Sequence, residues 1–206
     1  MRILVTAGPT REFLDAVRFL SNPSSGRMGF ACARAAARAG HEVLLVTGPA
    51  ELPDPPGVRT VRVVSAHDMY RAVLRAWPRM DAAIMTAAVG DYRPAKRVAG
   101  KIKKSAAPLT LRLVRTRDIL LELGRRKGRR RLVGFALETA DGPRQALLKY
   151  ERKKLDLIVL NGPASFAAGR MDADVYRERA VVKRFRRAPK DAVARWLVRA
   201  LERLER

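Results

Sequence analysis

A strand, a polar loop and a helix follow one another at the start of the chain, and this order constrains the fold more than any other feature. The strand is expected over Arg2–Ala7 and the helix over Ser24–Ala39, with Gly40 ending the helix. The loop between them is rich in glycine, proline and small polar residues. Because the first N–H groups of a helix lack intrahelical partners and its dipole favours negative charge, the junction predicts an anion site.

Four residues around the start of that helix are candidates for contact with an anion. Ser24 or Ser25 is expected to cap the helix through its hydroxyl group. Gly26 and Gly29 carry no side chain, so both leave room for a ligand close to the backbone.

Strands and helices continue to alternate along the chain, which is typical of a parallel sheet with crossover helices. Further strands are expected at Glu42–Thr47, Arg59–Val64, Ala82–Ala87, Leu109–Val114, Leu132–Leu137, Leu155–Leu160 and Ala180–Phe185. Further helices are expected at Ala66–Trp77, Asp118–Arg126 and Gly142–Lys153, and from Pro189 to near Arg206. An irregular loop is expected over Ala88–Pro108. We therefore predict one domain over residues 1–206 with a three-layer, Rossmann-like α/β fold, a mostly parallel central sheet and a small additional strand and loop region.

The charge of the chain favours anionic partners. The formal net charge is +23, from 43 basic and 20 acidic residues. The basic residues are spread along the chain with few aromatic residues beside them, so nucleic acid is not expected as a partner, and solvated surface arginines explain most of the excess. A nucleotide- or polyanion-binding module without catalytic activity stays open as an alternative.

Other features bear on the compartment. No apolar run reaches the roughly 20 residues of a membrane span. The chain starts directly with a strand, so no signal peptide is expected. The single cysteine, Cys32, cannot form an intramolecular disulfide and is expected to be a packed core thiol. A cytoplasmic location with no membrane partner is therefore expected.

The spacing of the glycines argues against a dinucleotide oxidoreductase. That fingerprint places Gly-x-Gly-x-x-Gly directly after the first strand and an acid at the end of the second. Here Gly26-Arg-Met-Gly29 comes much later, and the second strand ends in Val46-Thr47-Gly48. No Gly-Lys-Ser/Thr motif follows a strand, which excludes a P-loop. His41 and His67 have no Cys or His at ligand spacing, so no protein metal site is expected.

Several motifs then occur in one register, and together they resemble the phosphopantothenate–cysteine ligase family, the second activity of the bacterial bifunctional coenzyme A biosynthesis protein. The resemblance runs from Met1 to about Asn161 and fades beyond it. The motifs are Ile3-Leu-Val-Thr-Ala-Gly-Pro-Thr-Arg11, Asp15-Ala-Val-Arg18, Ser21-Asn-Pro-Ser-Ser-Gly-Arg-Met-Gly-Phe30, Ala87-Ala-Val-Gly-Asp-Tyr-Arg-Pro94, Lys101-Ile-Lys-Lys104, Val133-Gly-Phe-Ala-Leu-Glu-Thr139 and Lys153-Lys-Leu-Asp-Leu-Ile158.

The resemblance implies a ligase that joins 4′-phosphopantothenate to L-cysteine. CTP would activate the carboxylate as an acyl-cytidylate with release of pyrophosphate, and the cysteine amine would then displace CMP. Mg²⁺ would bridge phosphate oxygens, and the absence of a carboxylate cluster predicts an ion held by nucleotide and water. The FMN-carrying decarboxylase half of the fused proteins is absent from this sequence, so neither flavin nor decarboxylation is expected.

The resemblance also implies catalytic residues. Lys101 matches the lysine of the first half-reaction, whose ammonium would neutralise the triphosphate. Asn22 matches the asparagine that handles the acyl-cytidylate, and Arg18 matches an arginine near phosphopantothenate. Each residue also has a purely structural alternative. Lys101 would lie in a solvated, lysine-rich loop, Asn22 would bond only to the backbone of its loop, and Arg18 would be a surface arginine of a helix. We expect a substrate phosphate to bind at Ser24, Ser25 and Gly26, and the sequence leaves open which phosphate this is.

A further set matches the nucleotide positions of the family. The carboxylate of Asp91 would accept hydrogen bonds from ribose hydroxyls, or alternatively belong only to a turn. The ring of Phe135 would pack on the nucleotide base, or alternatively in the core. Lys149 and Lys153 share one helical face and would reach the same triphosphate, unless that face is merely solvated. The full set is Ala87, Asp91, Lys101, Arg117, Asp118, Ile119, Leu120, Phe135, Lys149 and Lys153.

Three departures from the family pattern leave the choice between CTP and ATP open. Arg117 stands where members commonly have proline, Gly90 stands at a usual alanine, and Gly162 follows Asn161 where an aspartate is common. The resemblance further implies a homodimer with the active site near the subunit interface. Leu109–Val114 and Ala88–Pro108 are the candidates for that interface or for a lid.

Overall fold

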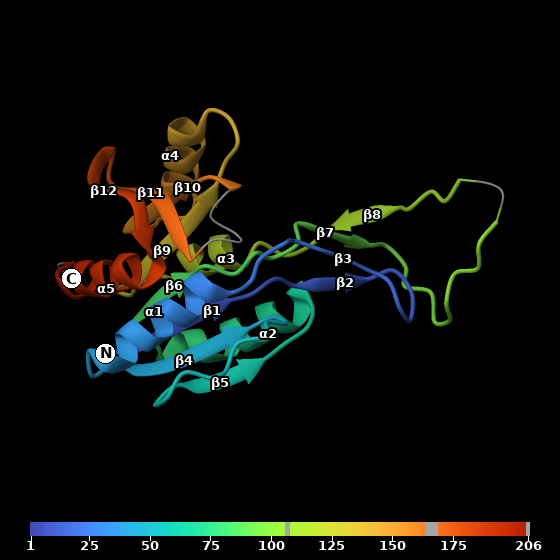
Figure 1. The fold of residues 1–206 in the computed structure, drawn as a ribbon, viewed down its shortest axis with the longest axis horizontal. Coiled ribbons are helices and arrows are strands. Elements are labelled where there is room, and N and C mark those ends of the chain that lie inside the picture. The colour runs from blue at the N-terminus through green and yellow to red at the C-terminus, as the bar shows by residue number, and fades with distance from the viewer. Residues whose placement is uncertain (106–107, 164–168, 205–206) are drawn as a thin grey trace.

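The computed structural model describes residues 1–105, 108–163 and 169–204. An eight-stranded sheet forms its centre (Figure 1). The six strands from β10 to β5 are parallel, whereas β11 pairs antiparallel with β10 and β12, which confirms the mostly parallel sheet predicted from the sequence. The spatial order is β12 (Ala180–Pro189), β11 (Arg170–Arg177), β10 (Leu157–Asn161), β9 (Arg131–Leu137), β6 (Ala82–Met85), β1 (Arg2–Ala7), β4 (Glu42–Thr47) and β5 (Arg59–Arg62).

Helices cover both faces of the sheet, because side chains along each buried strand point alternately to the two sides. Ile3 and Val5 face a core shared with α1 (Arg27–Arg38) and α5 (Lys190–Glu202), whereas Leu4 faces the opposite core. That second core contains α2 (Ala66–Ala76), which runs into a 3₁₀ turn at Trp77–Arg79, together with α3 (Ile119–Arg125) and α4 (Gly142–Arg152). The three-layer α/β prediction is confirmed. Within the described ranges, no helix combines the length and the apolar character needed to cross a membrane.

The start of α1 differs from the expected one. The helix begins at Arg27, and its cap position is Gly26, whose φ of 77° lies in the left-handed region that glycine tolerates best. The hydroxyl of Ser24 accepts a hydrogen bond from the Gly26 N–H at 3.4 Å rather than from an N–H of the first helical turn. The predicted serine cap is therefore wrong, because the glycine turns the chain before the helix starts.

Two hairpins that the sequence analysis did not predict extend from the carboxyl edge of the sheet. One pairs β2 (Arg11–Phe13) with β3 (Phe19–Ser21), and the other pairs β7 (Tyr92–Pro94) with β8 (Leu113–Arg115). We call the described residues of 11–21 and 92–115 the arm, and Figure 1 shows it projecting far beyond the layered body.

Several predicted boundaries need correction. The strand expected at Leu109–Val114 begins only at Leu113, where pairing with β7 starts, and it ends at Arg115. Strand β11 was missed, although its buried residues alternate with exposed ones. Residues 106–107 of the expected loop and residues 205–206 at the end of the last expected helix lie outside the described residues.

Candidate active site

A cavity of about 580 Å³ opens where the carboxyl ends of β1 and β6 meet. The chain runs from β1 through α1 to β4 on one side, and later returns through α2 to β6 on the other side of β1. The chain thus adds strands first on one side of β1 and then on the other, and open α/β sheets bind ligands at the point where the strand order switches in this way. Backbone hydrogen bonding between the segments that follow β1 and β6 continues past the strand ends, since the Ala88 N–H donates to the Gly8 carbonyl oxygen at 2.9 Å.

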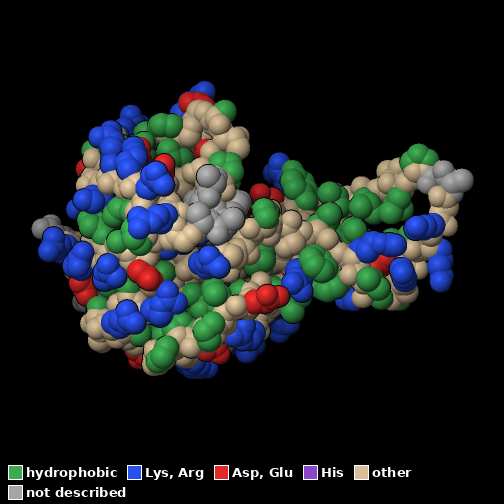
Figure 2. All heavy atoms as spheres, viewed as in Figure 1, with side chains coloured by type: hydrophobic (Ala, Val, Ile, Leu, Met, Phe, Trp, Pro, Cys, Tyr) green, Lys and Arg blue, Asp and Glu red, His purple; other side chains and the backbone are tan. Residues whose placement is uncertain are grey.

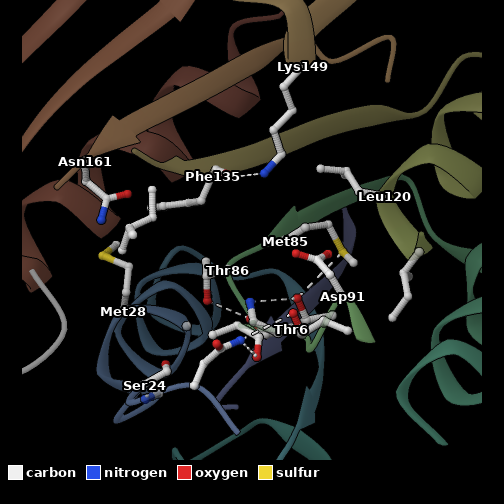
Figure 3. Close-up of a pocket in the computed structure, with 18 of the residues that line it drawn as sticks. Thr6, Ser24, Met28, Met85, Thr86, Asp91, Leu120, Phe135, Lys149 and Asn161 are labelled. Atoms are coloured by element: carbon white, nitrogen blue, oxygen red, sulfur yellow. Dashed lines mark hydrogen bonds between the residues drawn. The ribbon is translucent and has the colours of Figure 1, made fainter. Parts of the chain in front are cut away.

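Most of the residues predicted for the site line this one cavity. They come from the loop before α1, the segment after β6, the start of α3, strand β9 and helix α4, as Asn22, Ser24, Ser25, Gly26, Ala87, Asp91, Arg117, Asp118, Ile119, Leu120, Phe135, Lys149 and Lys153. Arg18 and Lys101 do not line it, because both lie on the arm. Figure 3 shows Lys149 reaching in from one side and Ser24 on the other.

The N-terminus of α1 forms one end of the cavity. Gly29 brings the helix against β1 so closely that a Cβ on it would lie 2.4 Å from the Ala7 Cβ and 2.6 Å from the Thr86 Oγ1. The first turn of α1 contains no acidic side chain, and no side chain caps the helix. Its N–H groups and dipole are thus directed at a cavity that Ser24 and Ser25 also line, which suits an anion.

Asn22 ties the loop before α1 to the segment after β6. Its side-chain amide donates to the Ala88 carbonyl oxygen at 3.1 Å and to the Val89 carbonyl oxygen at 3.4 Å. These bonds fix the side chain at the cavity wall, and they also match the backbone-bonding alternative considered from the sequence.

The opposite end of the cavity is formed by Lys149 of α4 and by Lys153 at the C-cap of that helix. Lys149 donates to the Phe135 carbonyl oxygen at 2.6 Å, and Lys153 reaches the Asp118 carboxylate at 2.9 Å. Burial, and then the nearby Lys153 charge, lower the pKa of Lys149 to about 8. Burial alone would raise the pKa of Asp118, but hydrogen bonds from Lys153 and the Leu121 amide outweigh it and hold the pKa below its usual value.

The predicted base and ribose contacts also border the cavity. Phe135 is half-buried and packs against the core while lining the cavity, so it contributes to both. Asp91 is exposed, and its carbonyl oxygen accepts the Thr116 N–H at 2.9 Å.

The three residues that depart from the family pattern are compatible with the shape of the cavity. The Arg117 guanidinium lies 5.0 Å from the Tyr70 ring centroid, a Cβ on Gly90 would find ordinary contacts from 3.5 Å, and a Cβ on Gly162 would meet nothing within 4 Å.

On the arm, Arg18 lies beside the segment Lys101–Lys104, which we call the lysine loop. Its Nη1 donates to the Asp15 carboxylate at 2.9 Å and to the Ile102 carbonyl oxygen at 3.1 Å, so it is one residue from Lys101 along the chain. Lys101 itself is exposed. The two residues are therefore brought together with each other, but away from the cavity of the same chain.

Comparison with known proteins decides the family. A model of the family "DFP: DNA/pantothenate metabolism flavoprotein C-terminal domain" matches residues 1–204. The chain belongs to this family. The resemblance stated from the sequence is thereby confirmed, since this domain is the phosphopantothenate–cysteine ligase half of the bifunctional protein.

Relatives of this DFP C-terminal domain are similar over most of the chain. The coenzyme A biosynthesis bifunctional protein CoaBC of Bacillus subtilis (strain 168) is 46% identical over 168 residues, which cover 81% of this chain and 41% of that protein. The chain thus spans less than half the length of such relatives. The crystal structure of the C-terminal domain of a CoaBC protein has a TM-score of 0.84 and 40% identity, covering 98% of this chain and 93% of the other. A complex of a Cab2 mutant with phosphopantothenate-cysteine shares the fold, with a TM-score of 0.79, 15% identity, and coverage of 97% and 85%.

Two cations of this DFP domain line the cavity without having been assigned from the sequence. Arg27 is the first residue of α1 and Lys190 the first of α5, and Lys190 is only 7% exposed. Burial, and then the Arg27 charge, lower the pKa of Lys190. A cation in the first turn opposes the helix dipole, and this unfavourable placement is the signal that identifies both residues from sequence. Other unassigned lining residues include Thr6, Met28, Thr116, Leu137, Glu138 and Met171.

Proposed function

We propose that the chain joins 4′-phosphopantothenate to L-cysteine for coenzyme A biosynthesis. CTP activates the carboxylate as an acyl-cytidylate, and pyrophosphate leaves. The cysteine amine then attacks the acyl carbon and displaces CMP. Family membership supports this reaction, and phosphopantothenate-cysteine is the molecule bound to the structural relative Cab2.

One observation carries the proposal: the cavity presents a helix N-terminus at one end and two lysine side chains at the other. The reaction needs two anionic groups held apart with a carboxylate between them. We assign the phosphate of phosphopantothenate to the α1 end and the triphosphate to Lys149 and Lys153. Asn22 at the cavity wall would then lie beside the acyl-cytidylate, and its amide would donate to the intermediate by giving up one of its bonds to the Ala88 and Val89 carbonyl oxygens.

Magnesium fits this site as an ion carried by the nucleotide. Within the described residues, no group of three His, Cys, Asp or Glu side chains could hold a metal. Asp91, Asp118 and Glu138 line the cavity, and Asp118 is already paired with Lys153. When bound, Mg²⁺ would neutralise phosphate charge, and Lys149 and Lys153 would position the same oxygens.

We further propose that two copies complete each other's sites. Most large apolar side chains that are exposed in the described chain lie on the arm, namely Val17, Phe19, Tyr92, Val98, Leu109, Leu111 and Leu113. Figure 2 shows apolar side chains along the arm and basic side chains towards its outer end. An exposed apolar patch of this kind is typical of a contact surface. In a homodimer the arm of one copy would deliver Arg18 and Lys101 to the cavity of its partner.

A coupled assay tests the proposed reaction. Pyrophosphate release is measured with phosphopantothenate, cysteine and CTP, ATP or neither, and the product is identified by mass spectrometry. We expect release that requires phosphopantothenate and a triphosphate, with CTP preferred. Absence of release with every triphosphate would defeat the ligase proposal.

Thermal shift separates the ligase from a polyanion-binding module. A ligase is expected to be stabilised by one triphosphate with Mg²⁺ at concentrations that leave NAD without effect. A module that recognises only negative charge would respond equally to CTP, ATP and pyrophosphate, and its response would fall together for all three as salt is raised.

A further inference from the structure

A fully buried carboxylate lies in the arm, far from the cores of the body. The side chain of Asp15 has no exposed surface, although it sits in the turn between β2 and β3. Its Oδ1 accepts the N–H groups of Val17 and Arg18, both at 2.7 Å. These two bonds close the hairpin turn locally and leave the second oxygen directed outward from the turn.

That second oxygen reaches across to the lysine loop. Asp15 Oδ2 accepts the Ile102 N–H at 3.0 Å and the Arg18 Nη1 at 2.9 Å. The same Nη1 donates to the Ile102 carbonyl oxygen at 3.1 Å. Both backbone polar groups of Ile102 are therefore bound by the Asp15–Arg18 pair, and a further bond joins the Val98 N–H to the Leu14 carbonyl oxygen at 2.9 Å.

We propose that Asp15 is a positioning residue that, together with Arg18, holds the backbone at Ile102 and thereby places Lys101 for the first half-reaction. The proposal deepens the proposed function and rests on it for the role of Lys101. Lys101 and Lys103 flank Ile102 and are exposed, so fixing this backbone restricts where both ammonium groups can reach. Catalytic groups displaced by about 1 Å lose on the order of a hundredfold in rate, so such restraint has a measurable effect.

The chemistry of the contact requires a carboxylate. Hydrogen bonds from the Arg18 and Val17 amides lower the pKa of Asp15 to about 2 despite its burial, so it accepts from every neighbour at neutral pH. Asparagine has the same shape but presents an NH₂ group on one side. In Asp15→Asn that group meets either the hairpin N–H groups or the Ile102 N–H, and one set of bonds is lost.

Limited proteolysis tests the restraint without reference to activity. Trypsin cleavage after Lys101, Lys103 and Lys104 is compared in the wild type, Asp15→Asn and the control Asp54→Asn, which removes a carboxylate paired with Arg62 on an exposed loop. We expect cleavage in this segment to rise several-fold in Asp15→Asn only. Unchanged cleavage would overturn the proposal, whatever the chain catalyses.

Kinetics test the consequence for Lys101. In Asp15→Asn we expect the kcat of CTP-dependent pyrophosphate release, per CTP-binding site counted by calorimetry, to fall on the order of 10- to 100-fold with the KM for CTP unchanged. Ile102→Pro removes the other partner of the same bond, so it should reproduce the defect, and the double variant should be no worse than the worse single variant.

The outcomes separate the two proposals. Multiplying defects in the double variant, or a raised KM for CTP with unchanged kcat, would overturn the positioning role. If the wild type releases no pyrophosphate but trypsin still cleaves the Lys101–Lys104 segment faster in Asp15→Asn than in the wild type, the ligase proposal is defeated. Asp15 then remains the residue that holds this segment.

Discussion

At the scale of single residues, the charge of Lys149 depends on its surroundings. The side chain lines the cavity, donates to the Phe135 carbonyl oxygen and lies near the Lys153 charge. Its pKa of about 8 in the folded chain lies below the 10.5 of a free lysine. Between these values the unfolded chain binds more protons, so the contribution of this group to the free energy of unfolding rises with pH across that window.

Nucleotide affinity should therefore depend on pH. Because a triphosphate favours the protonated lysine, we expect the CTP dissociation constant to rise on the order of tenfold between pH 8 and 9.5. Calorimetric titration across this range measures it. Lys149→Arg keeps its charge throughout and should flatten the profile. An equally flat wild-type profile would remove Lys149 from the nucleotide contacts.

Cys32 gives the opposite case, a titratable group expected to take no part in chemistry. It lies fully buried in α1, and burial raises the pKa of its thiol to about 12. We expect alkylation by iodoacetamide to be limited by unfolding, so that its rate rises only near the melting temperature. Rapid alkylation of the folded protein at pH 8 would show that the thiol is accessible and ionised.

Residue patterns predicted part of the site. The spacing of Lys149 and Lys153 placed both on one helical face, and both line the cavity. Their partners, the Phe135 carbonyl oxygen and the Asp118 carboxylate, lie on separate elements, and no local pattern encodes such a contact. Lys190 was missed although it stands in the first turn of an expected helix, because the antiparallel strand β11, which with β12 brings α5 to the cavity, was not expected from the sequence.

At the scale of elements, the distance between α1 and β1 determines where the helix N-terminus lies. A Cβ on Gly29 would approach the Thr6 carbonyl oxygen to 2.8 Å, besides its clashes with Ala7 and Thr86. The helix cannot relieve these contacts by a side-chain movement alone, because one of them involves backbone.

Gly29→Ala should push α1 away from the sheet. We expect the free energy of unfolding to fall by about 1–3 kcal/mol, as for other overpacked sites, and the KM for phosphopantothenate to rise. Urea denaturation and initial rates measure the two effects. Gly90→Ala is the matched control, since its Cβ would find only contacts of 3.5 Å or more. Equal stability of the two variants would contradict the close approach of α1 to β1.

Whether a helix or strand could be predicted from the sequence depended on its length and on how deeply it is buried. Regular strands of the parallel sheet and helices with polar caps were recognised, as Ser65 and Asp118 illustrate by capping α2 and α3. The short strands of the arm were not, because β2, β3, β7 and β8 have three residues each and pair only within hairpins. Leu109 and Leu111 alternate like a strand but stay exposed in this chain, so their pattern indicates a surface for contact rather than a strand of the sheet.

At the scale of the whole molecule, the cavity and the arm carry different parts of the proposed machinery. Lys149 lines the cavity and Lys101 lies on the arm. If sites are shared between copies, a chain defective only in its arm can supply an intact cavity to a chain defective only in its cavity.

Subunit complementation should reveal this sharing. Lys101→Ala and Lys149→Ala should each release little pyrophosphate alone. Co-expression at equal levels should recover about a quarter of wild-type activity, because half of the dimers are mixed and each holds one complete site. Two wild-type tags provide the control for mixing. No recovery in mixed dimers isolated through both tags would show that each site uses residues of one chain.

The outer edge of the sheet restricts how copies can meet. Strand β12 ends the sheet, and its exposed side chains include Lys183, Arg184, Arg186 and Arg187. An uncovered strand edge otherwise invites pairing with another chain, and rows of cations make two such edges repel. The charge therefore opposes the joining of two sheets through their β12 edges, and this protection weakens in concentrated salt, where the repulsion is screened.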